Sequence, residues 1–136
     1  MTPLPGLIDW FEHLSPESLT AIDRFYHPHC YFKDPFNELQ QRAALQQLFA
    51  RMFVSLQQPR FVVTDHLSQG DAVFMVWQFH FYYRQRPCLI NGSSHLKFDA
   101  DGLVHYHRDY WDAAEELYEK LPVLGFVLRK LKKLGH

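Results

Sequence analysis

The spacing of apolar residues predicts three helices in the first part of the chain. Apolar side chains recur at intervals of three and four residues over 5–14, 15–27 and 41–56, which is the repeat of one helix face. Ser15 is well placed to cap the second helix, because its hydroxyl can accept from a backbone N–H in the first turn. Between the second and third helices, 30–35 is predicted to be a short extended segment that ends at a proline. The third helix has the longest apolar stripe, formed by Leu45, Leu48, Phe49, Met52, Phe53 and Leu56.

After the third helix the pattern changes to that of β-strands. Runs rich in β-branched and aromatic residues predict strands over 60–67, 72–84, 87–98 and 103–111. A turn at 99–102, which ends in glycine, predicts that the last two strands form a hairpin. Alternation along the longest strand places one set of side chains on a single face, namely Val73, Met75, Trp77, Phe79 and Phe81.

Helices followed by a run of antiparallel strands predict an α+β fold, with the helices on one face of the sheet. The strand predicted at 72–84 has apolar residues on both faces, so both of its faces need cover. The helices can cover one face. A second copy of the chain is the natural cover for the other, and we therefore expect a homodimer.

The chain is predicted to end in helices. Residues 121–136 form an amphipathic pattern, with leucines and valines on one side and Arg129, Lys130, Lys132 and Lys133 on the other. Such a helix can bind a membrane surface, or it can pack on the domain or on a partner subunit with its basic face in solvent. We favour the second interpretation.

Composition restricts the function further. A length of 136 residues suits a single domain, 1–136, and a formal net charge of −1 gives no reason to expect nucleic-acid binding. Cys30 and Cys88 are far apart and outside any CxxC motif, so we expect reduced thiols and a cytoplasmic protein. No secretion signal or membrane span is predicted, and the sequence contains no phosphate loop, dinucleotide fingerprint or GxSxG motif.

Two short motifs complete the pattern: Asp34–Pro35 after the second helix, and "RDYWD" at 108–112, where the last strand ends. In this order and spacing, over residues 5–120, the chain resembles the NTF2-like superfamily and more narrowly its SnoaL-like branch, which includes polyketide cyclases, ketosteroid isomerase and limonene epoxide hydrolase. The resemblance implies a cone-shaped fold. A strongly curved, mainly antiparallel sheet would hold the helices on its concave face, enclose one apolar pocket and dimerise through its convex face.

The resemblance to ketosteroid isomerases implies a role for Asp34. In those enzymes the base is an aspartate followed by proline, which Asp34 matches. Their oxyanion hole consists of a tyrosine and a protonated aspartate, at positions that hold Trp10 and Ser94 in this chain. This chain therefore has the aspartate that serves as the base in ketosteroid isomerases, but different residues at both positions of their oxyanion hole. The resemblance therefore does not imply steroid isomerisation.

The limonene epoxide hydrolases offer a second pattern. Asp109 matches a catalytic aspartate of their last strand, and Tyr31 matches a tyrosine near the Asp–Pro position. The Arg-x-Asp of their middle strand is replaced by Trp77 and Phe79, and their asparagine by Lys33. The acid–base set of those enzymes is thus incomplete here, and their reaction is not implied either.

The resemblance assigns to the pocket the strand face that alternation gives to His105, His107, Asp109 and Trp111. The expected catalytic residues are Asp34, Asp109, His107 and Tyr31, and the expected ligand-binding residues are Trp10, Trp77, Phe79 and Ser94. Three potential metal ligands lie on this one strand face, but alternate residues about 6.6 Å apart cannot close a metal site alone. We expect no metal and no cofactor.

Simpler structural roles are open for the same residues. Asp34 before proline is common turn chemistry, His107 can be a wall residue, and Asp109 can pair with Arg108 or cap a following helix. Three functions follow: a cofactor-independent isomerase, cyclase or hydratase acting on a small apolar substrate, a non-catalytic binder of an apolar ligand, or a dimeric protein-interaction module. The enzyme is favoured, and the sequence does not predict its substrate.

Overall fold

The computed structural model describes residues 3–111, and the helices predicted after residue 111, including 121–136, lie outside this part. Within it the chain forms α1 (Leu4–Glu12), the 3₁₀ helix η1 (Ser18–Arg24), β1 (Tyr26–Lys33), β2 (Glu38–Leu39), α2 (Arg42–Ser55), β3 (Gln57–Gln69), β4 (Ala72–Tyr83), β5 (Arg86–Phe98) and β6 (Val104–Tyr110). None of the helices described here is long and apolar enough to cross a membrane.

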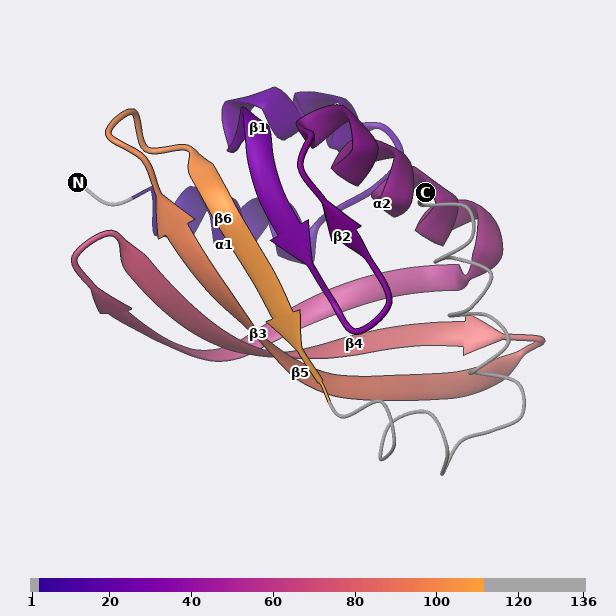
Figure 1. Ribbon diagram of the computed structural model, residues 1–136. Coiled ribbons are helices and arrows are strands. Elements are labelled where there is room, and N and C mark those ends of the chain that lie inside the picture. Colours follow the sequence, from indigo (N-terminus) through magenta and orange to yellow (C-terminus); the bar gives the residue numbers. More distant parts are fainter. Residues whose placement is uncertain (1–2, 112–136) are drawn as a thin grey trace.

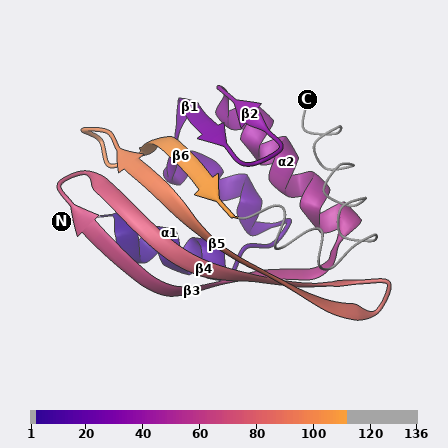
Figure 2. The same cartoon turned by 60° about the horizontal axis from the view of Figure 1, so that its bottom comes forward.

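The strands form one curved sheet in the order β2-β1-β6-β5-β4-β3. Figure 1 shows α1 and α2 on the same side of this sheet, inside its curve, and Figure 2 shows the same arrangement from below. The predicted α+β architecture is therefore confirmed. Most strand pairs are antiparallel, but β1 runs parallel to β6, so the C-terminal ends of these two strands lie at the same edge. Asp34 and Asp109 are brought to that edge from opposite ends of the chain.

The second predicted helix is shorter and tighter than its apolar pattern suggested. The predicted cap by Ser15 is wrong for this helix, because η1 begins at Ser18 after Glu17, which makes no side-chain cap hydrogen bond. Ser15 lies in the preceding turn, where the N–H of Ser18 donates to the Ser15 hydroxyl and the N–H of Ser15 donates to the Ser18 hydroxyl. The helix is a 3₁₀ helix that ends at Arg24, and Tyr26, which lies within the helix predicted over 15–27, begins β1 instead. Tyr26 is completely buried, so the same apolar position is satisfied by a strand.

The alternation predicted for β4 is confirmed. The predicted inward set, Val73, Met75, Trp77, Phe79 and Phe81, is buried. Phe74, Val76 and Tyr82 point the other way and remain exposed on the outer face of the sheet. The turn predicted at the start of β6 also forms, with Gly102 at a positive φ of 79° that an L-residue rarely adopts.

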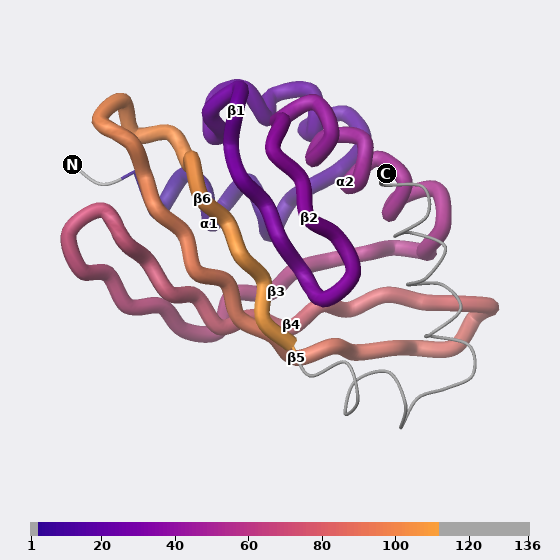
Figure 3. The backbone as a smooth tube through the Cα atoms, in the orientation of Figure 1, coloured from indigo at the N-terminus to yellow at the C-terminus, as the bar shows by residue number. Residues whose placement is uncertain are grey.

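One part of the predicted alternation fails, at the start of β6. Phe98 pairs with Val104 and Lys97 pairs with Tyr106, so His105 is an extra residue in a β-bulge. His105 is exposed, whereas His107 is buried on the inner face. Alternation had placed both histidines on one face with Asp109, and the bulge removes His105 from that set. The smooth tube of Figure 3 shows the course of β6 through this region.

Candidate functional site

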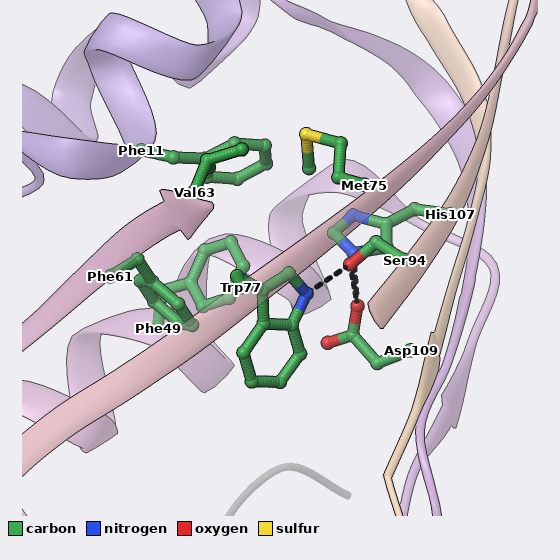
Figure 4. Close-up of a pocket in the computed structure, with 9 residues that line it drawn as sticks. All are labelled: Phe11, Phe49, Phe61, Val63, Met75, Trp77, Ser94, His107 and Asp109. Carbon is green, nitrogen blue, oxygen red and sulfur yellow. Dashed lines mark hydrogen bonds and ion pairs between the residues drawn. The ribbon is translucent and has the colours of Figure 1, made fainter. Parts of the chain in front are cut away.

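A cavity with two compartments lies between the curved sheet and the helices. The inner compartment has a cavity volume of about 20 Å³ and is lined by Phe11, Phe49, Phe61, Val63, Met75, Trp77, Ser94, His107 and Asp109, as Figure 4 shows. The outer compartment has a cavity volume of about 90 Å³ and is lined by Phe32, Asp34, Phe36, Asn37, Leu48, Phe49, Met52, Phe61, Trp77, Phe79, Ile90, Asp109 and Trp111. The two compartments adjoin one another, because they share four lining residues, Phe49, Phe61, Trp77 and Asp109.

The inner compartment contains a buried hydrogen-bond network centred on one oxygen of Asp109. Ser94 is the register partner of Asp109 on β5, and its hydroxyl donates to Asp109 Oδ1 at 2.5 Å. His107 lies two residues before Asp109 on the same face of β6, and its Nε2 is 2.6 Å from the same oxygen. Trp77 Nε1 donates to the Ser94 hydroxyl at 2.8 Å. Figure 4 shows Trp77, Ser94 and Asp109 joined in this order.

The hydrogen bonds of this network fit one direction when His107 carries a single proton on Nε2. The indole N–H of Trp77 can only donate, so the Ser94 hydroxyl accepts from it and donates its own O–H to Asp109. In this tautomer His107 Nε2 donates to Asp109 and His107 Nδ1 is an acceptor. The hydroxyl of Tyr26 lies 2.7 Å from Nδ1 and donates to it. Burial, with Asp109 and Cys30 adding to it, raises the pKa of Tyr26 well above its ordinary value, so Tyr26 keeps its proton.

The second oxygen of Asp109 is not used by this network. Among residues 3–111, Oδ2 of Asp109 has no hydrogen-bond partner, although the side chain is only 17% exposed. In Figure 4 this oxygen lies on the side of the Trp77 ring. Asp109 lines both compartments. The hydrogen bonds to Oδ1 hold the carboxylate in one orientation. Oδ2 is therefore available to accept a hydrogen bond from a molecule in the apolar cavity.

Asp34 is both a turn residue and a cavity residue. Its Oδ1 accepts from the backbone N–H groups of Phe36 and Asn37 at 2.8 and 2.6 Å, which is the predicted turn chemistry. It also lines the outer compartment with Asp109. Burial raises the pKa of Asp34, the backbone N–H of Phe36 acts in the opposite direction, and the charge of Asp109 raises it further. The two carboxyl groups are thus electrostatically coupled within one cavity.

Asn37 is a further polar residue of the outer compartment. Its Nδ2 donates to both oxygens of Asp34, at 3.1 and 3.2 Å, which fixes the orientation of the amide. Its Oδ1 is buried and has no hydrogen-bond partner among the residues described. A buried acceptor without a donor is costly in free energy, so this oxygen requires a donor from outside residues 3–111.

The structure does not bring Trp10 or Tyr31 to the cavity. Trp10 lies in the core between α1 and η1, where its ring stacks on Phe25 and its N–H donates to the Ser18 carbonyl. Tyr31 lies on the outer face of β1, where its hydroxyl donates to Glu38 at 2.6 Å. The other predicted residues, Asp34, Asp109, His107, Trp77, Phe79 and Ser94, all line one compartment or both.

Three residues at the site have roles that the sequence interpretation missed. Tyr26 and Asn37 belong to the networks just described. Gly92 is the register partner of Trp77, and a Cβ built on it would lie 2.4 Å from the indole ring, so only glycine lets Trp77 lie flat on β5. A glycine inside a strand is a recognisable signal of such a close approach. Nothing in the sequence pattern marks Tyr26 or Asn37.

A metal or a phosphate-bearing cofactor has little to bind in this cavity. Both ring nitrogens of His107 already have partners, and within residues 3–111 no three His, Cys, Asp or Glu side chains are grouped as metal ligands would be. Lys33 and Arg108 line an outer groove next to Asp34 and Asp109 and do not line either compartment. The polar groups present therefore fit proton transfer and hydrogen bonding to a small molecule.

Comparison with known proteins agrees with this architecture. A family model described as SnoaL-like domain matches residues 7–107. No curated protein matches the sequence. Among solved structures, a protein of ketosteroid isomerase-like fold from Catenulispora acidiphila, in complex with trimethylamine, has a TM-score of 0.72 at 15% identity and covers 90% of this chain and 97% of its own.

Two further solved structures carry names of enzymes. An LEH-like epoxide hydrolase from M. tuberculosis has a TM-score of 0.69 at 16% identity, covering 90% of this chain and 84% of its own. A protein described as a SnoaL-like polyketide cyclase, from Shewanella denitrificans, has a TM-score of 0.67 at 16% identity, covering 86% and 95%. At these identities the likeness establishes the fold and not the reaction.

Proposed function

Because the chain belongs to the SnoaL-like family, we propose that it is a cofactor-independent acid–base enzyme, of the isomerase, cyclase or hydratase type, acting on a small apolar substrate. The family includes isomerases, cyclases and epoxide hydrolases, which share a pocket rather than a reaction. The observation that carries the proposal is the state of Asp109. One of its oxygens accepts from Ser94 and His107, and the other lies at an apolar cavity without a partner among the residues that the structure describes.

In the proposed reaction, Asp109 Oδ2 takes a proton from the substrate. The donors on Oδ1 hold the carboxylate in place and leave it a single direction in which to accept. Asp34, whose pKa is raised by burial, gives its proton to the oxygen or carbon of the substrate that becomes electron-rich. In the isomerase form of this reaction, Asp34 protonates the carbonyl oxygen in the first step. Asp109 then returns its proton to a different carbon of the substrate while Asp34 recovers its proton from that oxygen, so the substrate is isomerised and both groups are restored. The sequence comparison had assigned the base to Asp34, and the geometry favours Asp109 for that role.

The test is hydrogen–deuterium exchange into enolisable apolar ketones such as 2-tetralone, followed by NMR in D₂O. Wild type is expected to accelerate exchange over buffer, and Asp109→Asn to remove about 10²–10⁴-fold of that acceleration, the usual contribution of a positioned base. Asp71→Asn, which changes an exposed carboxylate in the β3–β4 turn, is the matched control and is expected to behave as wild type. Equal exchange rates in wild type and Asp109→Asn would exclude Asp109 as the base.

A non-catalytic binder is the second candidate function. It is favoured by the lining of the outer compartment, in which ten of the thirteen side chains are apolar or aromatic. The C. acidiphila protein of this fold was crystallised with a small molecule, trimethylamine. Native mass spectrometry of protein purified from its own host separates the candidates, since a binder retains an unmodified small molecule.

We also infer that the chain forms a homodimer through the outer face of the sheet. Phe74 and Val76 of β4 and Tyr110 of β6 remain 41–44% exposed there, and β5 lies between these two strands. Large apolar and aromatic side chains exposed together on one face are typical of an interface. Sedimentation of wild type at twice the monomer mass, and of Val76→Arg at the monomer mass, is the expected result. A monomeric wild type would refute the inference.

A further inference from the structure

We propose that the ligand of the outer compartment carries a positive charge, as a protonated primary or substituted amine on an apolar body. This inference rests on the proposed function only in placing the substrate in the same cavity. It adds the chemical class of the substrate, which neither the fold nor the family determines.

The donors of the outer compartment are already used, because the Trp77 N–H is bonded to Ser94 and the Asn37 amide N–H groups are bonded to Asp34. Among its thirteen lining residues, the other polar side chains are Asp34 and Asp109, and there is no Lys, Arg or His. Within residues 3–111, Asn37 Oδ1 has no partner, both bonds to Asp109 are made by Oδ1, and Asp34 Oδ2 receives only the 3.2 Å contact from Asn37. In this mostly apolar enclosure the charge of Asp109, with the oxygens of Asp34 beside it, creates a local negative potential that favours a cation.

Asn37 shows that the acidic pair is not simply a solvated cluster. The residue is 94% buried, being 6% exposed, and its amide donors are already directed at Asp34. The remaining acceptor, Oδ1, has no donor within residues 3–111, and a donor that enters the cavity would satisfy it. An ammonium N–H is such a donor, while a carboxylate, ether or pure hydrocarbon is not.

The walls fit the same class of ligand. Seven aromatic side chains line the compartment: Phe32, Phe36, Phe49, Phe61, Trp77, Phe79 and Trp111. Phe61 stands perpendicular to Trp77 with ring centroids 5.6 Å apart, and Phe36 packs against Trp111 at the same separation. Rings at different inclinations present π-faces on several sides of an enclosed group, which is the arrangement that attracts alkylammonium ions.

Other ligand classes fit less well. A neutral hydrocarbon would bury the free oxygens of Asn37 and Asp109 without donors, which is costly. An anion would meet the carboxylate of Asp109 and the oxygens of Asp34 inside the cavity. The cations nearest to the site, Lys33 and Arg108, line only the open groove outside it. An anionic ligand would therefore be held at that groove, and the experiment distinguishes the two arrangements.

The experiment compares three probes of similar shape and different charge: benzylammonium, ethylbenzene and phenylacetate. Binding at pH 7 is followed by the indole N–H signal of Trp77 in NMR titrations, assigned with Trp77→Phe. Benzylammonium is expected to bind at least about 10-fold more tightly than ethylbenzene. Equal affinity of ethylbenzene, tighter binding of phenylacetate, or no shift with benzylammonium up to about 20 mM would each overturn the inference.

Variants localise the preference. Asp109→Asn is expected to reduce the preference for benzylammonium over ethylbenzene by about 5-fold, and Asp71→Asn to leave it unchanged. A preference unaffected by Asp109→Asn would refute the assignment. Binding is measured without turnover, so the two proposals can fail separately. A preference for the cation without deuterium exchange would refute the enzyme proposal and support the cation inference. Deuterium exchange without that preference would support the enzyme proposal and refute the cation inference.

Discussion

Replacing Tyr26 by phenylalanine tests the buried network at its most deeply placed member. Tyr26 is completely buried and its hydroxyl, 2.7 Å from His107 Nδ1, is the only donor to that nitrogen among the residues described. The substitution removes one oxygen atom and leaves the ring stacked on His107. The space left is too small for a water molecule, so His107 Nδ1 would become a buried acceptor without a donor.

The expected cost follows from that loss. Leaving one buried polar group unsatisfied lowers the free energy of unfolding by about 1–3 kcal/mol, and we expect about 2 kcal/mol because His107 is 3% exposed. For a domain of this size each kcal/mol corresponds to roughly 3–5 °C, which predicts a fall in Tm of roughly 6–10 °C. His107 would also lose the group that fixes its tautomer.

Urea denaturation measures the stability change, and long-range ¹H–¹⁵N NMR of the histidine rings measures the tautomer. Wild type is expected to show His107 with its proton on Nε2, and Tyr26→Phe a mixture of tautomers. A merely structural tyrosine would leave the tautomer unchanged. A loss of less than about 0.5 kcal/mol together with an unchanged ¹⁵N signal would refute the direction assigned to the network.

Three further predictions concern residues around the cavity. Because burial raises the pKa of Asp34, the free energy of unfolding of the wild type falls as pH rises through that pKa. Asp34→Asn keeps an oxygen acceptor for the turn but carries no charge. In urea denaturation this variant is therefore expected to be more stable than wild type at pH 7 and not at pH 3. Asp34→Ala is expected to lose about 1–2 kcal/mol with the turn bonds. Gly92→Ala would push the Trp77 ring away, lowering the free energy of unfolding by about 1–3 kcal/mol and shifting the Trp77 indole signal, and an unshifted signal would contradict the close approach. Glu12→Ala leaves the N–H of Val63 without its 2.9 Å acceptor and is expected to cost about 1–2 kcal/mol, while Glu12→Gln, which keeps an acceptor, retains most of the stability.

Much of the fold could be predicted because burial leaves a regular mark on the sequence. The apolar stripe of α2 and the alternation of β4 each repeat for several turns or pairs, and both elements lie where the pattern placed them. The two-residue strand β2 and the bulge at His105 leave no such mark. Each depends on pairing between distant segments, and one extra residue is enough to reverse which face a side chain occupies.

The site was predictable to the extent that strand alternation determined it. Asp109, His107 and Trp77 lie on inward positions of long strands, and they line the cavity as expected. Tyr31 occupies an outward position of β1, beside the inward Phe32, so its partner is Glu38 rather than the cavity. Trp10 lies on a helix, where its direction depends on how α1 packs against η1, and no spacing in the sequence specifies that packing.

The two aspartates show how ordinary structural chemistry and a functional role can occupy one side chain. Oδ1 of Asp34 is bound by turn N–H groups, and Oδ1 of Asp109 is bound by Ser94 and His107. In both residues the structural bonds concentrate on one oxygen and fix the direction of the other. The turn before Pro35 and a role in the cavity are therefore not alternatives for Asp34. The turn holds a carboxyl group of raised pKa beside Asp109, and this pairing across the ends of the parallel strands β1 and β6 is what both the proton-transfer proposal and the cation proposal require.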